Sequence, residues 1–373
     1  MKALLRALVH SRAVANPELL AAKLRGLTRS AGAEAVDLVD APLPGDAVAG
    51  IDADGRHWVL AEGESASTLG PLLLWLARAN AWARSHVLVP ATQAPGVAES
   101  LAAFRFGPSV WATEGAVATA VTMPALDEAT AGVGPPVTFD RHRLFDGLAA
   151  PEASAGEELL DRVQHTFPQV AVVPGHGCAV LTVAGLEVAR LVVEEGQVMF
   201  EVGVGAIDQD ARRRVVGHRN VDEATLAADL ADLAGAIEVV QAHRVAGGAP
   251  HPLRRLRRSR WLLAAVAERP DLAGLSPDLL LEPVADVNVS RSLTEDPPAV
   301  AVGAGEVVVC SAGIDLGAVP AAASAWLAAA DPGSRPRLTL VVTERDRHPA
   351  TEDLFALLSD EIPARLVTIP TPW

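Results

Sequence analysis

The sequence predicts an α/β protein in which two similar layered βαβαβ units flank a central β-meander followed by a long helix. Three observations predict this class. Short apolar runs, typical of buried strands, alternate with helical periodicity through most of the 373 residues. One order of strands and helices occurs twice. Between the two copies, apolar and polar residues alternate as they do in half-buried hairpins.

The first 123 residues predict an N-terminal α/β domain. Leucines in residues 1–30 follow a helical rhythm, which Pro17 is expected to interrupt. The run Asp52-Ala53-Asp54-Gly55 predicts a hairpin turn, because Asp-Gly supplies the positive φ angles that a tight turn requires. The later helices are expected at residues 69–84 and 96–104, and the later strands at 86–90, 109–113 and 117–122.

Residues 124–155 are rich in Pro and Gly and predict a linker. A C-terminal α/β domain is expected to occupy residues 156–373. We divide it into a meander-helix region (156–245), a basic segment with a loop (246–298) and the second βαβαβ unit (299–373).

An internal repeat is indicated by the similar patterns of residues 47–65 and residues 299–313. Each copy has a strand, a Gly-containing turn and a second apolar strand. Each then continues through a helix with a central tryptophan, Trp75 or Trp326, a strand, a short helix and a last strand. The matching order predicts a duplicated unit, in which ligands usually sit beyond the carboxyl ends of parallel strands.

Composition limits the function. The net charge of −15 disfavours nonspecific binding of nucleic acid over the whole surface. The two cysteines are far apart, which fits a reducing compartment, and no apolar run is long enough to span a membrane, so we expect a cytoplasmic protein. Lys2 and Lys23 are the only lysines, which excludes a Walker loop or a Schiff-base lysine in the rest of the chain.

The hairpin at residues 185–208 carries the candidate catalytic site. Glu187 and Glu201 are expected on paired strands, with Asp208 at a strand end. A helix, a meander and a second helix in this order resemble the core of the restriction-endonuclease-like nuclease superfamily. The resemblance implies that Glu187 and Glu201 bind a divalent metal such as Mg²⁺, although Gly203 stands where that superfamily has its lysine. Two glutamates on a sheet surface without a metal are the alternative.

A basic segment, HPLRRLRRSRWL, provides the candidate phosphate-binding residues. On one helix Arg254, Arg257 and Arg258 would share a face, and guanidinium groups suit phosphates. Pairing with carboxylates of the protein itself, or with an acidic protein partner, is the alternative in a chain with 46 acidic residues.

The run CSAGID, residues 310–315, marks a strand-to-helix junction. Ser311 or Asp315 is expected to cap the helix, and a small ligand could bind there. The runs FEVGVG, HPLRRLRRSRWL and VVCSAGID also resemble a bacterial family to which no activity is assigned.

Three hypotheses follow. The first is a divergent or degenerate metal-dependent nuclease-like protein that acts on or binds nucleic acid, with Glu187, Glu201 and Asp208 as catalytic residues. The second is a non-catalytic protein-binding or scaffold protein. The third is a small-ligand binder at the strand ends near Ser311 and Asp315.

Overall fold

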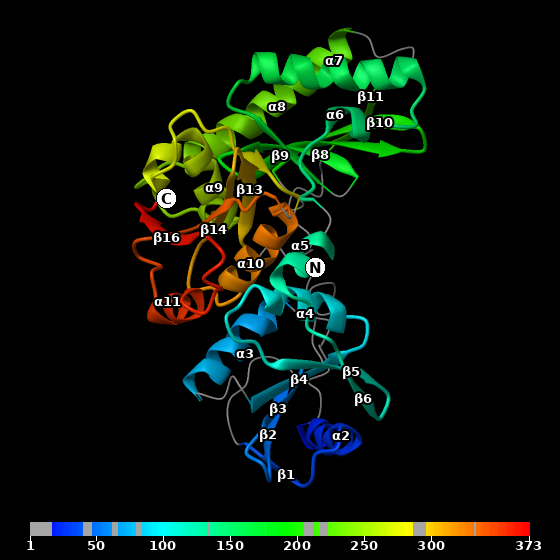
Figure 1. Ribbon diagram of the computed structural model, residues 1–373. Helices are drawn as coiled ribbons and strands as arrows, with labels where there is room; N and C mark the ends of the chain where they lie inside the picture. Colours follow the sequence, from blue (N-terminus) through cyan, green and yellow to red (C-terminus); the bar gives the residue numbers. More distant parts are fainter. Residues whose placement is uncertain are drawn as a thin grey trace, which may run out of the picture. The chain divides into compact units, whose positions relative to one another are not determined.

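The computed structural model describes residues 17–39, 47–61, 66–79, 84–132, 135–175, 177–204, 212–216, 223–285, 296–331 and 333–373 (Figure 1). These residues form a mixed α/β structure with three β-sheets. The chain divides into two compact units, Met1–Gly132 with Asp353–Asp360, and Val133–Glu352 with Glu361–Trp373. The α/β class predicted from the alternating apolar runs is confirmed.

The first unit contains a six-stranded sheet in the order β1-β2-β3-β4-β5-β6. Its parallel strands β3, β4 and β5 lie between antiparallel neighbours. The strands are β1 (Val36–Leu38), β2 (Ala47–Asp52), β3 (His57–Ala61), β4 (Ser85–Pro90), β5 (Ser109–Glu114) and β6 (Val117–Ala120). The helices are α2 (Pro17–Ser30), α3 (Ala66–Arg78), α4 (Ala94–Ala102) and α5 (Leu126–Gly132).

The core of this sheet lies under α2. Proline fits the first turn of a helix, and Pro17 begins α2. The helical rhythm expected before Pro17 lies outside the described residues. Leu20, Leu24 and Leu27 of α2 are buried in one cluster with Trp58 and other residues of the sheet. This spacing places the leucines on one helical face.

The second unit begins with α6 (Arg141–Leu144) and α7 (Ala150–Thr166) and contains an antiparallel middle sheet in the order β11-β10-β9-β8-β7. Its strands are β7 (Ala171–Pro174), β8 (Cys178–Val183), β9 (Leu186–Glu194), β10 (Gln197–Val202) and β11 (Arg212–Val216). After β11 comes α8 (Glu223–His243). Helices α7 and α8 lie on the same side of this sheet (Figure 1), and residues of both share one core with Leu181, Leu191 and Phe200.

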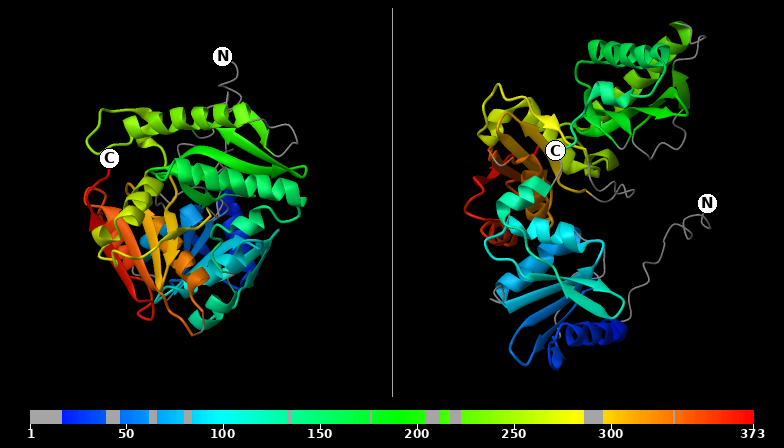
Figure 2. Two further views of the ribbon diagram at one scale, coloured as in Figure 1. Left: turned by 90° about the horizontal axis from the view of Figure 1, so that it is seen from above. Right: turned by 45° about the vertical axis from the view of Figure 1, so that its right-hand side comes forward.

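The last sheet has the order β12-β13-β14-β15-β16. Strands β12, β13 and β14 pair antiparallel, whereas β14, β15 and β16 pair parallel. The first sheet has the same pattern, because β1, β2 and β3 pair antiparallel and β3, β4 and β5 pair parallel. The strands, drawn from yellow to red in Figure 2, are β12 (Glu282–Pro283), β13 (Ala299–Gly303), β14 (Glu306–Ser311), β15 (Arg337–Thr343) and β16 (Ala364–Ile369). The helices are α9 (Arg258–Glu268), α10 (Ala318–Ala329) and α11 (Pro349–Phe355). The shared strand order agrees with the predicted repeat, and duplication itself stays a prediction.

Two expectations about local structure were wrong. The segment 124–155, expected to be a linker, contains α5, α6 and the first turns of α7, although the division between the two units at Gly132 and Val133 falls inside it. The basic segment is not one helix. It forms a 3-10 turn, η3 (Pro252–Arg255), then a residue with positive φ, Arg257, before α9 begins.

None of the described helices combines the length and the apolar composition that a membrane span requires.

Candidate functional site

The β9–β10 hairpin forms as its sequence predicts. Glu195 and Gly196 both have positive φ angles and form a two-residue turn. Glu201 of β10 pairs with Arg190 of β9, so their side chains emerge on the same face of the sheet.

A β-bulge brings Glu187 to that same face. The pairing of β8 with β9 shifts after Leu181, which faces Ala189, so that Thr182 faces Glu187 and one residue of β9 is extra. Val188 and Ala189 are accordingly buried in succession. Without the extra residue, Glu187 would alternate to the helix-covered face, because residues three apart on a regular strand point to opposite sides.

Glu187, Arg190 and Glu201 form one charged group, which we call the Arg190 cluster. The Arg190 Nε and Nη2 atoms lie 2.7 and 2.5 Å from Glu187 Oε1. Arg190 Nε lies 3.9 Å from Glu201 Oε2. The acids therefore share a guanidinium, and the cluster has a formal charge of −1.

The cluster is half-buried, and Arg213 of β11 stands opposite Glu201 in the register. The side chains of Glu187, Arg190 and Glu201 are 21%, 33% and 24% exposed. Val192 and Met199 pair with each other on the same face, and both are half-buried. Burial lowers the pKa of Arg190, but the charges of Glu187 and Glu201 outweigh that effect and raise it. The guanidinium therefore stays charged.

The cluster does not fit a divalent cation as it is arranged. A positively charged guanidinium contacts Glu187, where a nuclease-like centre would hold its metal. Among the residues that the structure describes, no group of three or more His, Cys, Asp or Glu side chains could hold a metal ion. Asp208 lies outside the described residues, and Gly203 donates its amide to Val188, as a strand residue does. The catalytic roles of Glu187, Glu201 and Asp208 stay predictions.

The three arginines of the basic segment have partners inside the protein. Arg254 donates to the Ala249 carbonyl at 3.3 Å. The charge of Arg257 lowers the pKa of Asp296, although burial raises that pKa by more. The Arg258 guanidinium lies over the Trp373 ring, 5.6 Å from its centre. The break between η3 and α9 removes the shared helical face that was predicted for phosphate binding.

The strand-end candidate at residues 310–315 begins with two buried residues, Cys310 and Ser311, and continues with partly buried and exposed ones. Cys310 is fully buried, and burial raises the pKa of its thiol, so this cysteine is not a reactive thiolate. Asp315 accepts a hydrogen bond from the Gly317 amide at 2.8 Å, just before α10. The cap residue of α10 is Gly317, and no described side chain caps this helix, so the capping role expected of Ser311 or Asp315 was wrong. Burial raises the pKa of Asp315, and Ser311 and the Gly317 amide lower it in part.

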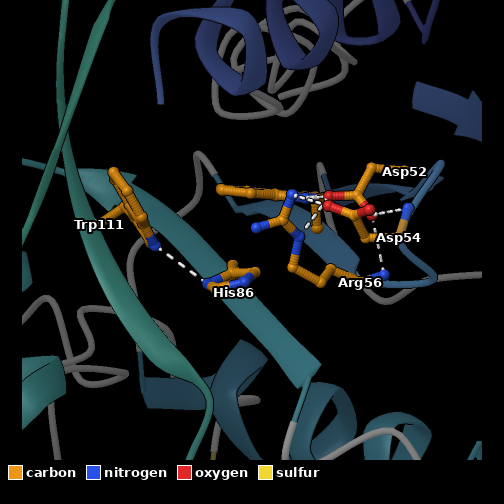
Figure 3. Close-up of polar contacts among 6 residues, drawn as sticks. Asp52, Asp54, Arg56, His86 and Trp111 are labelled. Carbon is orange, nitrogen blue, oxygen red and sulfur yellow. Dashed lines mark hydrogen bonds and ion pairs between the residues drawn. The ribbon is translucent and has the colours of Figure 1, made fainter. Parts of the chain in front are cut away.

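Two polar groups were not anticipated from the sequence. One is a network in the first sheet around Asp52, Arg56 and His86 (Figure 3). The other is Arg244, whose guanidinium is buried above Trp261 and donates to the carbonyls of Ala184, Leu253 and Leu256. Burial lowers the pKa of Arg244 to about 10, so it stays charged at neutral pH. The sequence signal that could have indicated this site is the position of Arg244, directly after the last residue of α8 and shortly before Gly247-Gly248.

Comparisons of the chain with protein-family models, with curated proteins and with solved structures return no match. The resemblances to a nuclease superfamily and to a bacterial family therefore stay predictions. The site has to be interpreted from its own geometry.

Proposed function

We propose that this protein is a non-catalytic protein-binding protein whose recognition surface is the Arg190 cluster with Val192 and Met199. The partner we infer is a polypeptide segment that presents an arginine or lysine between apolar side chains. The observation that carries the proposal is that Glu187 and Glu201 approach one guanidinium on a half-exposed sheet face.

Charge and burial support this partner. The two carboxylates and one guanidinium of the cluster carry a formal charge of −1 in a chain whose net charge is −15, which favours a basic ligand, although Arg213 of β11 stands opposite Glu201 in the register. Arg190 demonstrates that a guanidinium fits against these carboxylates. Val192 and Met199 supply apolar area beside the charges, and methionine adapts to varied partners.

A catalytic function has less support. A metal-activated water would need Arg190 to withdraw from Glu187, and removing a half-buried cation from its carboxylates costs free energy. Arg254 and Arg258 make contacts within the protein, with a backbone carbonyl and an aromatic ring, whereas the alternative interpretation of the basic segment expected carboxylates.

Fluorescence anisotropy with two short synthetic peptides tests the proposal. Both peptides carry the same apolar residues, and the central charged positions hold arginine in one and glutamate in the other. We expect the full-length protein to bind only the arginine peptide, and the Glu187→Gln/Glu201→Gln variant to bind it at least about tenfold more weakly. The matched control is Glu194→Gln/Glu195→Gln, which removes the same charge from the exposed turn of the same hairpin.

Equal binding of both peptides, or equal loss in the control, would overturn the proposal. A thermal shift with Mg²⁺ or Mn²⁺ provides the opposing test. A metal-dependent rise in the unfolding temperature that the Glu187→Gln/Glu201→Gln variant abolishes would favour the nuclease-like hypothesis instead, because a ligand stabilises the state that binds it.

A further inference from the structure

A histidine and two tryptophans form one cluster of rings on the face of the first sheet that α2 covers, and the Trp58 and Trp111 rings also contact each other, with centres 5.5 Å apart. The His86 ring of β4 stacks on Trp58 of β3, with ring centres 4.2 Å apart and planes 24° apart. In the same cluster, His86 Nδ1 accepts a hydrogen bond of 3.1 Å from Trp111 Nε1 of β5 (Figure 3). His86 therefore links three neighbouring strands.

This geometry requires a neutral imidazole. An indole N–H can only donate, so Nδ1 of His86 must keep its lone pair. Protonation would give His86 a second N–H that faces the indole N–H. The hydrogen bond would then be lost and two donors would oppose each other.

The surroundings of His86 oppose protonation. Burial lowers the pKa of His86 below its ordinary 6.5, the charge of Arg56 lowers it further, and Asp52 raises it in part. Helix α2, which packs on the same face, contributes Leu24 and Leu27 to this core.

We propose that His86 is a proton-sensitive lock in the first sheet: the neutral ring holds Trp111 against β4, and protonation releases Trp111. The direction of the pH effect follows from linkage. Because the folded state holds this proton less tightly than the unfolded chain does, the stability is complete above about pH 6.5 and falls as the pH drops toward the lowered pKa of folded His86. The device is independent of the Arg190 cluster, which lies in the other unit.

Fluorine NMR of the full chain tests the lock. The seven tryptophans are replaced by 5-fluorotryptophan, and Trp111 is assigned with Trp111→Phe. Between about pH 8 and pH 5 we expect the Trp111 resonance to shift with a midpoint below 6.5. In His86→Gln the resonance should stay constant, because an amide oxygen accepts from the indole at every pH in this range.

The control is His57→Gln. Burial also lowers the pKa of His57, but this residue precedes Trp58 on β3 and contacts Trp75 instead. The Trp111 titration should persist in this variant. A constant Trp111 resonance in the wild type, or the same titration in His86→Gln, would overturn the proposal. If His86→Gln does not fold, the pKa of His86 is measured instead from the pH dependence of its imidazole carbon resonance in the wild type. A pKa at or above 6.5 would overturn the proposal.

Discussion

Arg56 in the first sheet and Arg190 in the middle sheet each approach two carboxylates, but in different settings. Arg56 pairs with Asp52 at 2.8 Å and with Asp54 at 2.6 Å, all three within the β2–β3 turn. Arg190 contacts Glu187 on its own strand and approaches an acid of the next strand, Glu201. The same charges therefore stabilise a turn in one place and form a surface in the other.

The difference lies in burial and in the number of donors. The Asp52 side chain is 1% exposed, and four groups donate to it, namely the Asp54 and Arg56 amides, Arg56 Nε and Trp58 Nε1. A buried carboxylate needs such partners, so this one has a structural role. Glu187 and Glu201 keep a fifth or more of their side chains exposed and can exchange partners.

The largest effect in this comparison is expected from Asp52→Ala. The variant leaves Trp58 Nε1 and two amides without an acceptor and should lower the free energy of unfolding of the first unit by about 3 kcal/mol. Chemical denaturation followed by tryptophan fluorescence measures the loss. Asp54→Ala is the control, because Asp54 is 72% exposed and should cost much less. Equal costs for the two variants would contradict the structural role of Asp52.

The second largest effect is expected from acid, which should remove the stability that Asp52 gives to the first unit. Burial raises the pKa of Asp52, but the hydrogen bonds from Trp58 and Arg56 and the charge of Arg56 outweigh it, and the net pKa lies below 3.8. The stability that Asp52 contributes is therefore present above pH 3.8 and is lost as the pH falls through the lowered folded pKa. Chemical denaturation at a series of acid pH values should show that the free energy of unfolding falls more steeply with decreasing pH in the wild type than in Asp52→Asn. The same pH dependence in both proteins would contradict this.

The sequence predicts most elements because local signals and packing agree. Asp-Gly at residues 54–55 and Glu-Gly at 195–196 specify tight turns, and Gly55 and Gly196 adopt the positive φ angles required. The apolar residues of α8 recur at helical spacing, and Leu233, Ile237 and Val240 are buried on one face. Local chemistry therefore predicts the two hairpins and this helix.

The candidate site was predicted only in part, because it depends on contacts across strands. The sequence placed Glu187 and Glu201 on adjacent strands, but the bulge that aligns Glu187 with Arg190 comes from the pairing of β8 with β9 and has no local signal. The basic segment has a helical pattern, yet Arg257 adopts a positive φ at the start of α9, where the nonlocal Asp296 accepts from the Ser259 amide. Tertiary contacts outweighed helix propensity there.

A moderate effect is expected from Arg190→Leu. Glu187 and Glu201 would then lose the guanidinium that they share, but water reaches both, so the loss should be about 1 kcal/mol. Chemical denaturation at low and high salt measures it, and the loss should shrink when salt screens the two acids. A loss as large as that of Asp52→Ala would mean that the Arg190 cluster is also structural.

The smallest and most discriminating effects come from double-mutant cycles of Arg190→Leu with Glu187→Gln and with Glu201→Gln. Glu187 lies within hydrogen-bond distance of Arg190 and should couple to it by about 0.5–1 kcal/mol, whereas Glu201, at 3.9 Å, should couple by less than about 0.5 kcal/mol. Urea denaturation of the single and double variants gives both coupling energies. Stronger coupling to Glu201 than to Glu187 would contradict the geometry. With the expected order, Glu187 is the carboxylate that holds Arg190 in place.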